Sequence, residues 1–183
     1  MTTLKAREPA PRYLAPPPAA PIWQVNKRDA ARDPAGALRT LVERVQAGTP
    51  VQLYEAVEQG VPSSIVPLIA AAFGDTVTSV MNLVGLSEST FRRKEEAHEP
   101  LPEVAGHRVM GFLRIVATLR RLLHESGDPQ ALERFDLEAW VREWLATPLP
   151  EFDARTPGQL LRNPEGQRAL EDLLHRMRGG LPA

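Results

Sequence analysis

The sequence predicts an all-α protein, and three observations lead to that prediction. Apolar residues recur at three- and four-residue spacing in one segment after another, which is the period of an amphipathic helix. Proline and glycine separate these segments at places where helices typically begin and end. No stretch of the 183 residues shows the sustained alternation of apolar and polar residues that a half-buried strand requires.

The composition excludes several classes of protein. Hydrophobic residues make up 43% and charged residues 25%, so the chain can bury a core. Cysteine is absent, which excludes disulfides, thiolate metal sites and a cysteine nucleophile. The formal net charge is −1, so any DNA binding would need a local basic patch. The sequence shows neither a membrane span nor a signal peptide, and we expect a cytoplasmic protein without membrane contacts.

Residues 1–34 are predicted to form a disordered arm. Six prolines fall within the first 21 residues, and proline lacks the amide donor that helices and inner strands need. Ile22, Trp23 and Val25 form a short apolar group within this arm, which could dock on the folded part of the chain.

Residues 35–102 are predicted to form a helical region that contains a helix-turn-helix. Its first two helices are expected at residues 35–47 and 50–59, and Ser63 or Ser64 is expected to cap a third, which runs to about Phe73. Asp75 or Thr76 then caps a fourth helix, which Gly85 ends, and Ser87 caps a fifth, which ends before Pro100. Two short helices joined by a tight glycine turn are typical of a helix-turn-helix.

The second helix of this pair would present its N-terminal residues to DNA bases. The candidate DNA-binding residues are Ser87, Ser89, Thr90, Arg92 and Arg93. Hydroxyl side chains and arginines suit contacts to base edges. Between residues 87 and 98, however, three acidic residues balance three basic ones, whereas phosphate attraction normally supplies much of the affinity. The sequence leaves open whether the two helices bind DNA or form only a scaffold or a dimer surface.

Residues 103–183 are predicted to form a long helix and a small C-terminal domain. The long helix is expected at about residues 103–125 and carries Arg108, Arg114, Arg120 and Arg121, with no acid between residues 104 and 124. These arginines either face DNA or pair with acids in the C-terminal third. Further helices are expected to begin after Asp136, Thr156 and Asn163. Trp140 and Trp144 are four residues apart on one helix face, which predicts that both lie in the core.

No motif predicts an enzyme. The four histidines lack a metal-binding spacing, and the glycine motifs that bind nucleotide phosphates are absent. We therefore expect a non-enzymatic protein with no catalytic residues, no metal site and no cofactor. One alternative function is a stand-alone transcriptional regulator, which would need a small-molecule pocket in its C-terminal third.

Three segments from about residue 60 to residue 183 carry a family resemblance. They are VGLSESTFRRKEEAHEPLPEVAGHRVMGFLRI, AWVREWLATPLPEFDARTPGQLL and NPEGQRALEDLLHRM, and their order and spacing resemble the Xre/MbcA/ParS antitoxin family. The resemblance implies an antitoxin of a type II toxin–antitoxin system. It further implies an Xre-like DNA-binding region that represses the operon, and a C-terminal part that neutralises the toxin by occluding its active site.

The resemblance also implies the partners and the surfaces that meet them. The partners would be a RES-type, NAD-degrading toxin from the same operon, operator DNA and a second copy of the chain. The toxin-facing surface would comprise the loop at residues 148–155, the last helix and the C-terminal tail. Its candidate residues are Glu151, Asp153, Arg155, Arg178, Gly179, Gly180, Leu181, Pro182 and Ala183. The tail either threads into the toxin or is a frayed chain end.

Overall fold

A computed structural model describes residues 21–126 and 135–178, and these residues form helices and no β-strand. The prediction of an all-α fold is therefore confirmed. The helices are α1 (Lys27–Arg32), α2 (Pro34–Ala47), α3 (Pro50–Glu58), α4 (Ile65–Ala72), α5 (Val77–Leu83), α6 (Glu88–Glu96), α7 (Glu103–Ser126), α9 (Leu137–Ala146), α10 (Pro157–Leu160) and α11 (Pro164–Arg178), with one 3₁₀ turn, η1 (Pro150–Phe152).

Side-chain caps fix where most of these helices begin. An oxygen of the preceding Asp, Asn, Ser or Thr accepts a hydrogen bond from a backbone amide of the first turn, which would otherwise lack a partner. The capping residues are Asn26, Asp33, Thr49, Thr76, Ser87, Asp136, Thr156 and Asn163. The predicted caps at Thr76, Ser87, Asp136 and Thr156 are thus confirmed.

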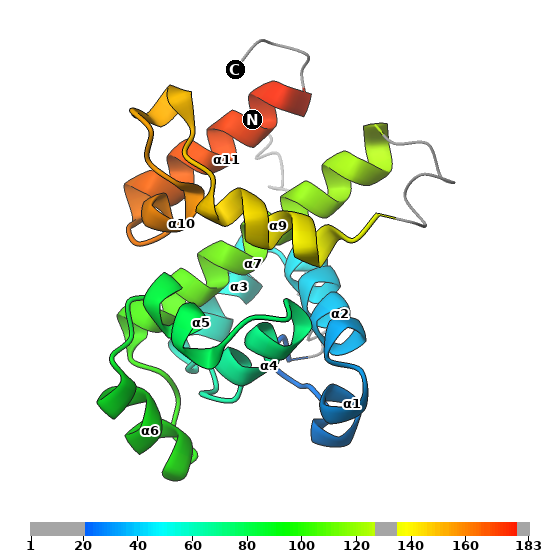
Figure 1. Ribbon diagram of the computed structural model, residues 1–183. Coiled ribbons are helices and arrows are strands. Elements are labelled where there is room, and N and C mark those ends of the chain that lie inside the picture. Colours follow the sequence, from blue (N-terminus) through cyan, green and yellow to red (C-terminus); the bar gives the residue numbers. More distant parts are fainter. Residues whose placement is uncertain (1–20, 127–134, 179–183) are drawn as a thin grey trace, which may run out of the picture.

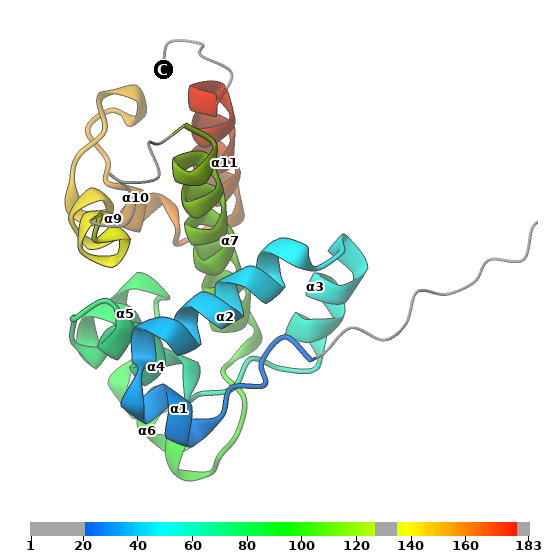
Figure 2. The same cartoon turned by 90° about the vertical axis from the view of Figure 1, so that its right-hand side faces the viewer.

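The long helix α7 connects two groups of helices (Figure 1). Its packing partners are α2 and α3 on the N-terminal side of the chain and α11 on the C-terminal side. Figure 2 shows α11 running alongside the upper half of α7, with α9 and α10 next to them, while α1, α4, α5 and α6 lie around the lower half. The loop that contains η1 and the helix α6 therefore lie at opposite ends of the molecule (Figure 1).

A single hydrophobic core follows α7. Phe112, in the middle of the helix, is 1% exposed, and its ring centroid lies 5.5 Å from that of Phe73 at the end of α4. Leu41 of α2 and Leu170 of α11 are fully buried in the described structure. Because α7 contributes to the packing of both groups of helices, their relative placement depends on the side chains of this helix.

Part of the predicted arm differs from the expected disorder. Residues 21–34 include α1, and Ile22 is buried in the core. The indole nitrogen of Trp23 donates a 2.7 Å hydrogen bond to the carbonyl of Ala56 in α3. Burial of an apolar side chain together with a satisfied indole donor offsets the entropy of ordering this short segment. The expected docking of this apolar group is confirmed, whereas residues 1–20 lie outside the described structure.

Within the described ranges, no single helix is both long and apolar enough to cross a membrane. Helices α4 and α5 taken together have the length and apolar composition of a membrane span, but they are bent by 112° with respect to each other.

Truncation of Phe112 should destabilise the whole protein. We expect Phe112→Ala to lower the free energy of unfolding by about 3–5 kcal/mol, because it leaves a cavity between the two groups of helices. Val104→Ala on the same helix is the matched control, since Val104 is 60% exposed and its loss should change stability by less than about 0.5 kcal/mol. Urea unfolding followed by circular dichroism measures both, and equal effects would contradict the central role of α7.

Candidate functional site

Helices α5 and α6 are joined by a turn that the sequence specifies residue by residue. Gly85 has φ +63°, in the left-handed region that glycine adopts without strain, and Leu86 is buried beneath the turn. The Oγ atom of Ser87 then accepts a hydrogen bond from the amide of Thr90 and begins α6. Phe91 is the buried anchor of α6, so the other side chains of its first turns face outward.

The predicted DNA-binding residues lie together on α6 and its cap, but several of them already have partners. Ser87 donates a 2.8 Å hydrogen bond to Thr90, and its hydroxyl lies 3.4 Å from that of Ser89. Arg92 pairs with Glu88 one turn earlier. Arg93 is exposed and forms no ion pair with any residue that the structure describes. Arg93 is thus the candidate whose charge is most accessible to a phosphate.

A second ion pair lies at the end of α6. The Lys94 ammonium donates a 2.8 Å hydrogen bond to the Glu99 carboxylate. This hydrogen bond and the lysine charge hold the pKa of Glu99 below its usual value of 4.5, and the Arg93 charge lowers that pKa further. Glu99 therefore stays ionised at neutral pH and offsets part of the positive charge of α6. The chain leading from α6 to α7 is fixed by the amide of Leu101, which donates to the carbonyl of Val61 at 2.8 Å.

Two arginines join this region to the C-terminal helices. Arg108 of α7 donates from Nε to the carbonyl of Arg162 at 2.8 Å and from Nη1 to the carbonyl of Val84 at 3.0 Å. Arg142 of α9 donates to the carbonyl of Phe73 at 2.6 Å, at the end of α4. Both guanidinium groups meet helix C-terminal carbonyls, which lack intrahelical donors and carry partial negative charge.

Two of the four arginines of α7, Arg108 and Arg114, have structural contacts that the sequence left undecided. Arg114 forms a 3.0 Å ion pair with Glu171 of α11. This contact agrees with the expectation that arginines of the long helix pair with acids in the C-terminal third. Arg121 has a buried Nε atom that makes no hydrogen bond with a described residue. Arg120 lines a surface pocket together with His124, near the end of α7, and Arg39 of α2.

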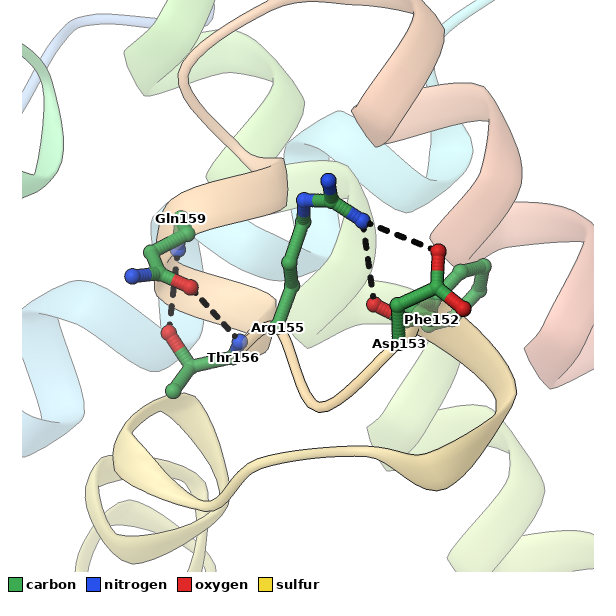
Figure 3. A network of polar contacts seen from close by, with 5 residues as sticks. All are labelled: Phe152, Asp153, Arg155, Thr156 and Gln159. Atoms are coloured by element: carbon green, nitrogen blue, oxygen red, sulfur yellow. Dashed lines mark hydrogen bonds and ion pairs between the residues drawn. The ribbon is translucent and has the colours of Figure 1, made fainter.

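The loop between α9 and α10 is a compact turn whose geometry is shown in Figure 3. After η1, Asp153 and Ala154 adopt φ values of 52° and 59°, which reverse the chain. The amide of Leu149 then donates to the carbonyl of Arg155 at 3.0 Å and closes the loop. Thr156 and Gln159 form a reciprocal capping box that begins α10 (Figure 3).

Comparison with known proteins places a family domain on these C-terminal helices. Residues 130–180 match the family described as "Antitoxin Xre/MbcA/ParS C-terminal toxin-binding domain". A curated relative, the "Prs ADP-ribosylating antitoxin" of Sphingobium sp. (strain YBL2), is 27% identical over 132 residues, which cover 72% of this chain and 81% of the relative. This part of the chain is a toxin-binding domain of the Xre/MbcA/ParS antitoxin family, and both comparisons support an antitoxin of this type. Its helices α9, α10 and α11 form the toxin-binding domain, and the predicted resemblance is confirmed.

Three of the residues predicted to face the toxin lie in the closed loop of this antitoxin. Glu151, Asp153 and Arg155 are exposed, and the Arg155 guanidinium lies 3.3 Å from the Asp153 carboxylate (Figure 3). Arg178 is the last residue of α11. Gly179, Gly180, Leu181, Pro182 and Ala183 lie outside the described residues. The contacts of all these residues with a toxin remain predictions.

The expectation that Trp140 lies in the core of the antitoxin is wrong. Trp140 is 37% exposed, and its ring stacks on that of the half-buried Trp144. Leu137 and Val141 occupy the inward face of α9, which leaves Trp140 about 100° away around the helix. In the sequence, the apolar residues Leu137 and Val141 at i and i+4 already indicated the inward face of α9.

A pocket of about 410 Å³ lies between the toxin-binding domain and helices α4, α5 and α7 of the antitoxin. Phe73, Phe112 and Leu145 form part of its apolar lining, and Arg142 lies at the same pocket. A stand-alone regulator would need such a pocket for a small molecule, but the family match favours the antitoxin. In the described ranges, no group of three or more His, Asp or Glu side chains has an arrangement that could hold a metal ion.

Removal of backbone strain in the loop should stabilise the antitoxin. Ala154 has a Cβ atom in the left-handed region, which costs about 1–2 kcal/mol for an L-residue. Ala154→Gly relieves this strain and loses about 0.5–1 kcal/mol to the greater flexibility of glycine, so we expect a net gain of roughly 0.5–1 kcal/mol. Ala139→Gly in α9 is the control and should destabilise by about 0.5–1 kcal/mol. Thermal unfolding tests both, and a loss of stability in Ala154→Gly would contradict the loop geometry.

Proposed function

We propose that this antitoxin neutralises a RES-type, NAD-degrading toxin encoded in the same operon. The observation that carries the proposal is the match of residues 130–180 to a toxin-binding domain, which coincides with a folded helical unit. The name of the Sphingobium relative connects it with ADP-ribosylation of Prs. ADP-ribosylation uses NAD as the donor of the ADP-ribose group, and in the proposed system the toxin is the partner that would consume NAD.

The proposed mechanism is occlusion of the toxin's active site. The loop residues Glu151, Asp153 and Arg155 would contact the toxin at the rim of its cleft, since their side chains are exposed and take no part in the hydrophobic core. Arg178 and the tail from Gly179 to Ala183 would enter the cleft. The antitoxin itself would supply no catalytic group, metal ion or cofactor, and would act in the cytoplasm.

Deletion of the tail should separate binding from inhibition. We expect the full-length antitoxin to co-purify with the product of the adjacent gene and to suppress its consumption of NAD. A variant that ends at Arg178 should still co-purify, while the toxin in the complex regains NAD turnover. The antitoxin alone, incubated with NAD, is the control and should show no turnover. If no complex forms with the full-length chain, toxin neutralisation is contradicted; if the shortened chain still inhibits, the tail is not the inhibitor.

We further propose that the antitoxin represses its operon as a homodimer through α5 and α6. Ser87, Ser89, Thr90, Arg92 and Arg93 would contact the operator, and α6 lies at the edge of the molecule, where it is accessible to a groove (Figure 1). Two copies related by a two-fold axis would read two half-sites. The ion pairs of Arg92 and Lys94 with neighbouring acids leave Arg93 as the main electrostatic contact.

Removal of Arg93 should weaken operator binding more than removal of Arg92. We expect Arg93→Ala to lower affinity and to reduce the slope of log K against log salt by about 1, because one phosphate contact is lost. Arg92→Ala should have a smaller effect, since Glu88 already offsets its charge. Fluorescence anisotropy with the DNA upstream of the gene measures both changes. Arg168→Ala on α11 is the control, and equal losses for all three variants would contradict the assignment of α6.

A further inference from the structure

Three aromatic side chains form a continuous row on the surface of the toxin-binding domain. We name this row the aromatic ladder, and it consists of Phe135, Trp140 and Trp144. The ring centroids of Phe135 and Trp140 lie 6.2 Å apart, and those of Trp140 and Trp144 lie 6.0 Å apart with an angle of 8° between the ring planes. Phe135 is 40% exposed and Trp140 is 37% exposed, while Trp144 packs against the core.

The helix cap and the buried face of α9 hold the aromatic ladder in place. Asp136, directly after Phe135, caps the start of α9. The burial of Leu137 and Val141 fixes the rotation of α9 about its axis. Trp144 rests on the core and supports the stacked ring of Trp140. Aromatic side chains held in this way lose little further conformational freedom when a partner binds. Tryptophan is also enriched among the residues that contribute most to the affinity of protein interfaces.

A basic pocket adjoins the ladder at the Phe135 end. This pocket has a volume of about 270 Å³, and its lining includes Arg39 of α2, Arg120 and His124 of α7, and Phe135 itself. Glu138 is the only carboxylate in the described lining, and neither Arg39 nor Arg120 forms an ion pair with a described residue. Two guanidinium groups beside exposed aromatic rings suit a partner surface that carries carboxylates around an apolar patch.

The family match indicates which partner this surface serves. All three residues of the ladder fall within residues 130–180, the part of the chain that matches a toxin-binding domain. Helix α6 lies beyond the N-terminal end of α7 and apart from α9, so a partner on α9 would leave it uncovered (Figure 1). Other exposed apolar side chains are Val51 and Tyr54 on α3 and Val104 on α7, outside the matched domain, and Met177 on α11, within it.

We propose that the aromatic ladder and the adjoining basic pocket are a docking surface for the cognate toxin. The toxin would cover Trp140 with an apolar patch and would place acidic side chains against Arg39 and Arg120. This contact is separate from the loop at residues 148–155 and from the tail, and it would supply affinity while those segments act at the active site. The inference rests on the proposed neutralisation of a toxin, and names a further surface for that interaction.

Truncation of Trp140 tests the ladder directly. We expect Trp140→Ala to weaken binding of the purified toxin by roughly 10- to 100-fold in calorimetry, as for a central aromatic residue of an interface. Tyr54→Ala is the matched control, because Tyr54 is 61% exposed on α3 and outside the matched domain, and it should bind as tightly as the wild type. Circular dichroism and sedimentation of each variant report its fold and its state of association.

Charge reversal at the pocket gives a second test that does not alter the aromatic packing. We expect Arg39→Glu to weaken toxin binding, with a loss that shrinks as the salt concentration rises. Arg32→Glu on α1 is the control, because this arginine is exposed and lies outside the pocket lining. A loss in Arg39→Glu without a loss in Arg32→Glu would support the pocket even if Trp140→Ala failed to fold.

The outcomes separate the ladder from the proposed function. If the wild type binds the toxin and Trp140→Ala and Arg39→Glu bind equally well, the ladder is overturned while toxin neutralisation stands. If the wild type itself does not bind the toxin, both fail. If Trp140→Ala dissociates a homodimer but leaves toxin affinity unchanged, the ladder joins two copies of this chain, and docking of the toxin there is overturned.

Discussion

The fold depends on one constraint, which is that α7 must be buried by both groups of helices at once. Phe112 packs against Phe73 of α4, while α11 lies along the same helix on the C-terminal side. An amphipathic helix normally buries one stripe and exposes the opposite face to water. In the described structure, α7 instead contacts α2, α3 and α11, so neither group of helices can keep its packing without it. The toxin-binding domain and the α5–α6 unit are therefore parts of one packed structure.

Two arginines strengthen this connection with directional contacts. Arg108 joins the carbonyl of Val84, which ends α5, to that of Arg162 in the toxin-binding domain. Arg142 joins α9 to the end of α4. Each guanidinium group uses donors in a fixed planar arrangement, which a lysine would not reproduce. A displacement of α10 would therefore change the hydrogen bonds of Arg108 at the turn before α6, and a displacement of α9 would change those of Arg142 at the end of α4.

The two exposed surfaces of the antitoxin differ in their physical character. Helix α6 presents hydroxyl groups and charged side chains, and acids already pair with Arg92 and Lys94, so Arg93 would supply most of any salt-dependent attraction to a polyanion. Helix α9 presents stacked aromatic rings, whose burial in an interface is favourable mainly because apolar area leaves water. The first kind of surface suits a polyanion, and the second suits a protein partner.

The sequence by itself determined the helical class, most helix starts and the resemblance to the antitoxin family. Caps such as Ser87 and Thr156 act within one turn, so a local pattern is sufficient to predict them. Only the tertiary structure decided which helix faces are inward, because that depends on neighbours distant in the chain. It placed Trp140 on the surface, ordered Ile22 and Trp23 against the core, and directed Arg108 and Arg142 to carbonyls more than twenty residues away. These contacts join residues whose separation along the chain carries no periodic signal, since each arises when two packed helices bring a donor and an acceptor together.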